Sequence, residues 1–430
     1  MSAIRPALVV DPPRALVDEV VTVRVEGCVP HTLVELDART HDEQGLAWTS
    51  SAVFESDAHG TVDLTTRAPR EGSWSEASAM GFVWSMAQDP SEPPQRYHQT
   101  DLRPATVSLE ASTEGTVLAR AELERVFVAP GVTRSDIRTD GLVGTLYEPA
   151  SRSGEGRAAV LVLGGSLGGL ENARAAALAS RGHPALALAY FGIDPLPDEL
   201  VGVELEYFDT AIRFLIDRGL ARPGRLALMG TSRGGELVLL LASRSRDVGG
   251  VIAYVPSGVV HYGIPTGGDR RRIEVSDDPD QRPPAWVVSG RGIPGAPVRF
   301  DLIDFGDRPV RFCPAFRGGL ADEKAIESAR IALDDVTVPV ILFSTADDQV
   351  WPSPALADLA VERLTSSTSV EHIVYEDAGH NIGHPYMPTS TRSYIHPLNG
   401  LDMALGGTDA GDAFANQDSW ERALALLARI

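Results

Sequence analysis

The pattern of apolar and polar residues divides the chain into two regions. From about residue 6 to residue 125, short stretches in which apolar and polar residues alternate are separated by Gly, Pro and Asp. A period near two predicts strands with one buried face, so we expect an antiparallel, immunoglobulin-like β-sandwich over residues 1–128. The expected strands are 19–25, 33–36, 60–66 and 105–109.

After about residue 126 the pattern changes to continuous apolar runs that alternate with segments of helical periodicity. The run 158–163 is typical of a strand buried on both faces of a sheet. Strands that alternate with helices predict a doubly wound, mostly parallel sheet over residues 129–430. The expected strands are 141–147, 158–163, 185–189, 225–229, 250–254, 338–344 and 369–375, and the expected helices are 171–180, 205–218, 236–245, 353–364 and 419–428.

Residues 257–335 interrupt this alternation. The stretch is rich in Gly, Pro, Arg and Asp and shows neither period. It is too long for an ordinary connection, so we expect a lid or long loops inserted over a functional site.

Two pentapeptides have the spacing G-x-S-x-G, at residues 164–168 and 230–234. Each follows a predicted strand, and the second also directly precedes a predicted helix. A serine at a tight turn between strand and helix is the nucleophile of α/β-hydrolases, and the turn needs small flanking residues. We therefore predict an α/β-hydrolase fold with Ser232 as nucleophile. The reverse assignment, with Ser166 as nucleophile, is disfavoured by strand order.

In that fold, an earlier glycine-rich loop and the residue after the nucleophile supply backbone N–H groups to the oxyanion. The sequence thus predicts Arg233, Ser166 and Leu167 as backbone donors of an oxyanion hole.

The acid and the base should follow later strands. Asp347 and Asp348 come after the strand at 338–344, and the fold's usual spacing selects Asp348, whereas Asp347 fits a turn-stabilising role better. His380 follows the last strand and completes the order Ser, Asp, His. His384 is a minor alternative for the base, and His372 lies inside the expected strand.

Longer motifs are distributed along both regions of the chain. They are 18–19 (DE), 45–50 (GLAWTS), 60–64 (GTVDL), 80–86 (MGFVWSM), 164–171 (GGSLGGLE), 189–192 (AYFG), 204–208 (ELEYF), 232–236 (SRGGE), 347–353 (DDQVWPS), 378–380 (AGH) and 385–386 (PY). Through these motifs the chain resembles the bile acid-CoA:amino acid N-acyltransferase and acyl-CoA thioesterase family, in its bacterial branch, over nearly its whole length. That resemblance implies transfer of an acyl group from a thioester to Ser232 and then to water or an amine. Members devoted to amide formation tend to carry Cys at the nucleophile, so the resemblance favours hydrolysis at Ser232.

Two positions depart from the family's pattern. Thr345 stands where glycine is usual, and Arg233 where lysine is common. Residues 257–335 match poorly. The choice of acyl group and acceptor therefore stays open.

Charge limits the partners. The formal net charge of -21 at pH 7 argues against nucleic acid or an anionic membrane as partner. We expect a small acyl thioester, linked to CoA or to a carrier protein. Lys324 is the only lysine in the chain, so arginine side chains would have to bind the phosphates of such a thioester. The densest basic cluster is residues 270–272, although a solvated loop is the simpler interpretation of it.

The remaining features predict absences. Cys28 and Cys313 are too few for a cysteine metal site and are not expected to form a disulfide. Neither a metal nor a dinucleotide cofactor is expected. No apolar run has the length of a membrane span or of a signal-peptide core, so a cytoplasmic location is expected. The oligomeric state is not predicted.

Alternatives to a thioesterase stay open at this stage. An acyltransferase would use the same site with an amine or hydroxyl acceptor. A carboxylesterase of the dienelactone-hydrolase type and a catalytically inactive binding module are the others. Trp84 and Trp286 could line an acyl channel, but core packing is the better expectation for Trp84.

Overall fold

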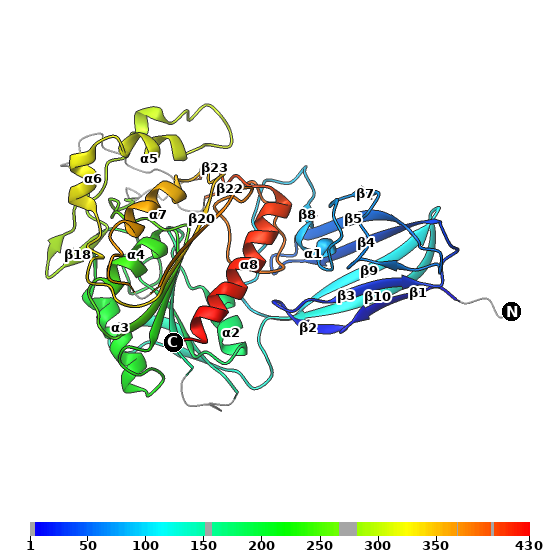
Figure 1. The fold of residues 1–430 in the computed structure, drawn as a ribbon, viewed down its shortest axis with the longest axis horizontal. Helices are drawn as coiled ribbons and strands as arrows, with labels where there is room; N and C mark the ends of the chain where they lie inside the picture. Colours follow the sequence, from blue (N-terminus) through cyan, green and yellow to red (C-terminus); the bar gives the residue numbers. More distant parts are fainter. Residues whose placement is uncertain (1–4, 151–156, 266–281, 368, 397–399) are drawn as a thin grey trace. The chain divides into compact units, whose positions relative to one another are not determined.

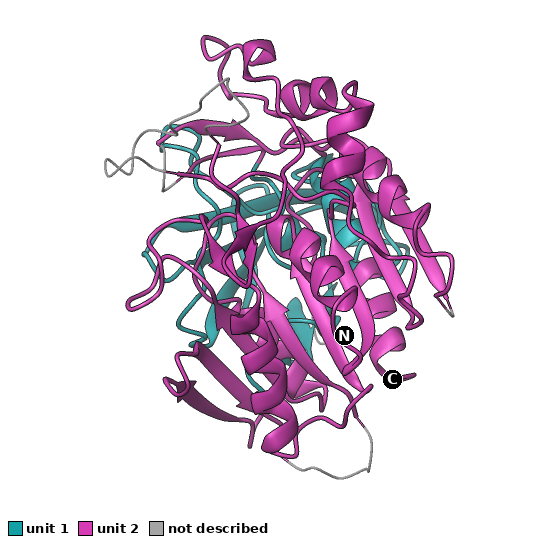
Figure 2. Ribbon diagram, turned by 90° about the vertical axis from the view of Figure 1, so that its left-hand side faces the viewer, with its two compact units in different colours: residues 1–129, 384–391, 408–417 teal, residues 130–383, 392–407, 418–430 magenta. Residues whose placement is uncertain are grey.

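The computed structural model describes residues 5–150, 157–265, 282–367, 369–396 and 400–430. The chain divides into two compact units (Figure 2). Unit 1 contains residues 1–129, 384–391 and 408–417, and unit 2 contains residues 130–383, 392–407 and 418–430. The division expected near residue 128 stays a prediction for domain boundaries; by contacts, the first segment of unit 1 ends at residue 129 and two C-terminal segments also belong to this unit.

Unit 1 is a sandwich of two sheets, as predicted (Figure 1). Strand β4 (Leu33–His41) alternates buried and exposed residues over its whole length. Its buried residues Val34 and Leu36 share one core with Val23 and Val25 of the other sheet. The first sheet has the order β1 (Ala7–Asp11), β3 (Thr22–Glu26), β6 (Val62–Asp63). The second has the order β2 (Arg14–Leu16), β10 (Thr116–Val126), β9 (Ala105–Thr113), β4 (Leu33–His41), β5 (Ala47–Glu55), β7 (Glu71–Gly72), with β8 (Ala87–Gln88) also paired to β5.

One expected strand of unit 1 is much shorter than predicted. The strand expected over 60–66 is reduced to β6, because the Asp63 carboxylate accepts hydrogen bonds from the N–H and hydroxyl of Thr65. The chain turns there instead of continuing as a strand. The short helix α1 (Gly81–Trp84) is fully buried in this unit.

Unit 2 is built on an eight-stranded sheet in which β12 (Val143–Glu148) is antiparallel to both of its neighbours and all other neighbouring strands are parallel. Numbered along the sheet's own strands, the order is 1-2-4-3-5-6-7-8, which is that of an α/β-hydrolase. The fold class predicted from the sequence is confirmed. The order is β11 (Thr133–Ile137), β12 (Val143–Glu148), β14 (Ala185–Ala189), β13 (Ala159–Leu163), β16 (Leu226–Thr231), β17 (Val248–Tyr254), β20 (Val340–Thr345), β21 (Val370–Tyr375).

Helices cover both faces of this sheet (Figure 1). Helices α3 (Glu206–Asp217), α4 (Arg233–Ala242) and α7 (Ser353–Val361) lie on one face, and α2 (Asn172–Ser180) lies on the other. The last helix, α8 (Asp409–Leu427), begins ten residues before the start expected at 419. Strands β13 and β14 are buried at every position, as their apolar sequences predicted.

The stretch expected as a lid or long loops contains more regular structure than predicted. Its described part includes two strands, β18 (Trp286–Val288) and β19 (Arg291–Gly292), a 3-10 turn at Phe300–Leu302, and two helices, α5 (Cys313–Gly319) and α6 (Glu323–Ala329). Strand β18 pairs with β15 (Val203–Glu204). Ile326 and Ala329 of α6 share a small core with Trp351 and Leu356. The basic cluster at 270–272 lies outside the described residues. A two-stranded sheet, β22 (Ser393–Ile395) and β23 (Asp402–Ala404), completes the fold.

The two cysteines are not bonded to each other. Cys28 and Cys313 are both free and buried. Burial raises the pKa of each thiol.

Candidate active site

Ser232 lies at the turn between β16 and α4. Its backbone angles, φ 57 and ψ -119, are outside the regions that residues with a side chain normally adopt. The N–H of Ser232 donates to the carbonyl oxygen of Tyr254 at 2.9 Å, which fixes the turn against strand β17. Strain of this kind persists only where the surrounding structure fixes it, and it is typical of functional sites.

The glycines around Ser232 are required by close backbone contacts. A Cβ atom at Gly230 would lie 2.1 Å from the carbonyl oxygen of Gly234. A Cβ atom at Gly234 would lie 2.4 Å from the carbonyl oxygen of Gly164. Since a Cβ atom at either position would force backbone atoms apart, the second G-x-S-x-G motif meets the steric demand that the sequence predicted.

The structure brings Ser232, His380 and Asp348 together. The Nε2 atom of His380 is 3.0 Å from the hydroxyl of Ser232, and its Nδ1 atom is 2.9 Å from a carboxylate oxygen of Asp348. The Asp348 carboxylate is buried and also accepts the N–H groups of Val350 and Trp351. This arrangement can orient the imidazole and accept a proton from the serine hydroxyl.

The alternative acid and histidines proposed from the sequence make other contacts or belong to the other unit. Asp347 accepts the N–H of Gly407 at 2.8 Å and the side-chain amide of Gln349, which suits a turn. His372 contacts Asp358 and Ser344, away from the nucleophile. His384 belongs to unit 1.

The glycine-rich loop before α2 lies beside the nucleophile. A Cβ atom at Gly165 would be 3.3 Å from the Cβ of Ser232, so Ser166 and Leu167 follow directly at the site. The Tyr190 hydroxyl donates to the carbonyl oxygen of Gly164 at 2.6 Å and holds this loop. The N–H groups of Ser166, Leu167 and Arg233 stay candidates for binding an oxyanion.

A buried charged network lies behind Ser232, and the sequence did not predict it. Glu236 is completely buried and accepts the indole N–H of Trp286 at 2.6 Å. It also contacts the guanidinium of Arg233 and the ring Nδ1 of His261, each at 3.1 Å. Burial lowers the pKa of His261, although Glu236 opposes that shift. The only sequence signal was a charged pair, Arg233 and Glu236, inside an otherwise apolar helix.

The two tryptophans considered for an acyl channel have different surroundings. Trp286 is fully buried, and its indole N–H donates a hydrogen bond to the Glu236 carboxylate. Trp84 belongs to the core of unit 1.

The described residues contain neither a metal-binding cluster nor a membrane-spanning helix. No group of three or more His, Cys, Asp or Glu side chains there could hold a metal ion. Among the same residues, no helix combines the length and the apolar character that crossing a bilayer requires.

The fold and this site define an α/β-hydrolase with a serine at the strand–helix turn. Residues 18–139 match the N-terminal region of the acyl-CoA thioester hydrolase/BAAT family, and residues 203–266 and 315–429 match its C-terminal region. The chain belongs to this family of enzymes, which is the family that the sequence motifs indicated.

Curated relatives agree over most of the chain. It is 30% identical over 419 residues to acyl-coenzyme A thioesterase 6 of Mus musculus, with 95% of this chain and 93% of that protein covered. It is 29% identical over 426 residues to the mitochondrial acyl-coenzyme A thioesterase 2 of Homo sapiens, with 94% and 80% covered. The cytoplasmic location expected for the chain stays a prediction.

Among solved structures, a puromycin-hydrolyzing peptidase of Mycobacterium tuberculosis is 15% identical with a TM-score of 0.45, covering 91% of this chain and 54% of that one. A likeness of that degree carries no argument about substrate.

Proposed function

We propose that this protein hydrolyses acyl-CoA thioesters, with Ser232 as nucleophile, His380 as base and Asp348 as the acid that orients it. The main support for this proposal is the pair of hydrogen-bond contacts that join the Ser232 hydroxyl through His380 to Asp348. Membership of a family of acyl-CoA thioester hydrolases supports the choice of substrate.

The first half of the reaction forms an acyl-enzyme. His380 accepts the Ser232 proton as the serine oxygen attacks the thioester carbonyl. The resulting oxyanion is bound by the N–H groups of Arg233 and of Ser166 or Leu167. Collapse of this intermediate breaks the carbon–sulfur bond, and the departing CoA thiolate takes the proton from His380.

The second half releases the acid. His380 accepts a proton from water as the water oxygen attacks the ester carbonyl of acylated Ser232. The new oxyanion collapses, the carboxylic acid leaves, and the proton returns to the serine oxygen.

The test measures thiol release from a panel of acyl-CoAs, with and without glycine or taurine. The two motif serines give a matched pair of variants, Ser232→Ala and Ser166→Ala. We expect Ser232→Ala to lower kcat by roughly 10⁴-fold or more. Ser166→Ala should stay within about 10-fold of the parent, because only its backbone N–H is used.

Other outcomes would change the assignment. An amide product that forms only with added amine would make the protein an acyltransferase at the same site. Turnover of oxyesters but not thioesters would make it a carboxylesterase. Lack of labelling by a fluorophosphonate would contradict a nucleophilic Ser232 altogether.

A further inference from the structure

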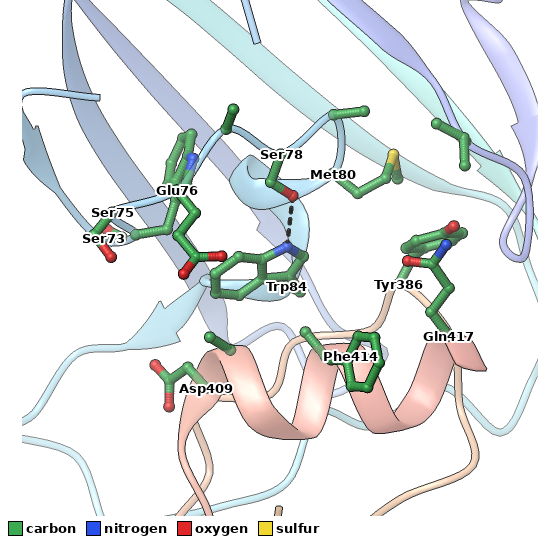
Figure 3. Close-up of a pocket in the computed structure, with 16 residues that line it drawn as sticks. Ser73, Ser75, Glu76, Ser78, Met80, Trp84, Tyr386, Asp409, Phe414 and Gln417 are labelled. Atoms are coloured by element: carbon green, nitrogen blue, oxygen red, sulfur yellow. Dashed lines mark hydrogen bonds between the residues drawn. The ribbon is translucent and has the colours of Figure 1, made fainter. Parts of the chain in front are cut away.

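Unit 1 contains a groove that the proposed chemistry does not use. Its volume is about 500 Å³, and it lies between residues 73–80 and the first half of α8 (Figure 3). Every residue that lines it belongs to unit 1, whereas Ser232, Asp348 and His380 belong to unit 2. The lining residues are Val20, Ser73, Trp74, Ser75, Glu76, Ala77, Ser78, Ala79, Met80, Trp84, Tyr386, Asp409, Ala410, Ala413, Phe414 and Gln417.

Trp84 gives the groove a fixed aromatic surface. Its indole N–H donates to the Ser78 hydroxyl at 3.0 Å, so the polar edge of the ring is already satisfied. Its backbone carbonyl accepts both the N–H and the hydroxyl of Thr389. A ring held at both its backbone and its edge needs no reorganisation to receive a ligand on its face.

Small residues keep the groove open. Ala77 and Ala79 lie on one wall, and Ala410 and Ala413 of α8 lie on the other. Larger side chains at these positions would fill part of the groove.

The charged side chains that line the groove are acidic. Glu76 and Asp409 line it, and none of its lining residues is a Lys, Arg or His. Figure 3 shows both carboxylates at one end of the groove next to Trp84, with the ring of Phe414 farther along. Phe414 is 63% exposed, so the far end offers an apolar surface. Within the described part of the chain, the exposed Glu76 carboxylate has no ion-pair partner.

We propose that this groove binds an organic ammonium ion, with the cationic head against Trp84 and Glu76 and the apolar part toward Met80 and Phe414. The face of an indole attracts a cation through its quadrupole, and tryptophan does so more strongly than other aromatic residues. The adjacent Glu76 carboxylate adds direct attraction and selects against neutral ligands of the same shape.

The experiment measures binding of choline to the full chain by isothermal titration calorimetry. The uncharged isostere 3,3-dimethyl-1-butanol provides the matched ligand control. We expect saturable choline binding that weakens as salt concentration rises. The isostere should bind roughly 2- to 5-fold more weakly than choline, as expected for loss of a cation–π contact.

Two variants test the assigned contacts. Glu76→Gln removes an exposed charge, and Trp84→Phe keeps an aromatic ring in the core; each should weaken choline binding roughly 2- to 5-fold. Glu122→Gln, an exposed acid on β10 that does not line the groove, is the control and should leave binding unchanged.

Four results would overturn the proposal. The first is that choline shows no saturable binding, and the second is that the uncharged isostere binds equally well. The third is a dissociation constant that neither groove variant changes. The fourth is loss of choline binding after fluorophosphonate labelling of Ser232. The last would place the ligand at the candidate active site instead. Because the readout is binding, the result does not depend on whether the protein hydrolyses thioesters.

Discussion

At the residue scale, the two neighbouring aspartates after β20 differ in all their contacts. Asp348 meets the imidazole of His380, whereas Asp347 meets the backbone of Gly407. We expect Asp348→Asn to lower kcat for thioester hydrolysis by roughly 10⁴-fold, because an amide no longer holds the productive tautomer of the imidazole. Asp347→Asn should change kcat by less than about 10-fold. Steady-state kinetics of both variants decides, and equal losses would contradict the assignment.

Glu236 gives a second prediction at this scale. Glu236→Gln removes the carboxylate charge and leaves the buried guanidinium of Arg233 without a counter-charge. Breaking a buried pair in this way costs about 3–5 kcal/mol, so the free energy of unfolding should fall by that amount. Denaturant titration measures the change. Glu323→Gln, an exposed acid on α6, serves as control, and an equal effect of both changes would argue against a structural role for the pair.

Ser232 and His380 could be predicted because their evidence is local. Each follows a strand whose apolar run is plain in the sequence, and chain order then restricts their roles. The network behind the nucleophile could not be predicted in this way. His261 and Trp286 lie 25 and 50 residues beyond Glu236, and their contacts depend on how the inserted stretch folds back.

At the element scale, the turn from β16 to α4 depends on the absence of side chains. A Cβ atom at Gly234 would meet the carbonyl oxygens of Gly164 and Leu163 at 2.4 and 2.5 Å. We expect Gly234→Ala to destabilise the protein by about 1–3 kcal/mol, because the loop that follows β13 must move away from the start of α4. Activity should fall as well, since that separation moves Ser232 relative to the Ser166 loop.

The measurements are denaturant titration and thioester kinetics. Gly306→Ala is the matched control, since the nearest atom to its added Cβ is a side-chain oxygen of Asp304. A stable, fully active Gly234→Ala protein would contradict the steric argument.

The central strands could be predicted within a few residues, whereas α8 could not. Its first half buries Asp412 and Asn416 and exposes Phe414, which reverses the usual relation between polarity and burial. No apolar periodicity marks those turns, so only the later part of the helix was expected. The helices of the inserted stretch are short, and α5 begins at Cys313 and Pro314 with no periodic signal.

At the scale of the whole molecule, buried histidines make stability depend on pH. Burial lowers the pKa of His183, of His261 and of His372. An unfolded histidine titrates near pH 6.5, so below that pH the unfolded chain binds protons that the folded chain does not. The stability that these three histidines contribute by staying neutral is therefore fully present above about pH 6.5, and it is lost as the pH falls toward their lowered pKa values.

His183→Gln isolates one of these contributions. His183 is buried and its Nδ1 atom is 3.0 Å from the carbonyl oxygen of Ala158. The thermal midpoint of the variant should decline less than that of the parent between about pH 7 and pH 5. His59→Gln, at an exposed position, is the control. Parallel curves for parent and His183→Gln would exclude a role for this residue.

The arrangement of the chain in unit 1 has a consequence for how such proteins can evolve. That unit is assembled from residues 1–129, 384–391 and 408–417, so its coding sequence is not one continuous block. A gene fragment ending near codon 129 would encode the sandwich without the α8 residues that form a wall of the groove. Exchange of this unit between genes by a single recombination event would therefore leave it incomplete. Lineages that keep the groove should inherit both ends of the gene together.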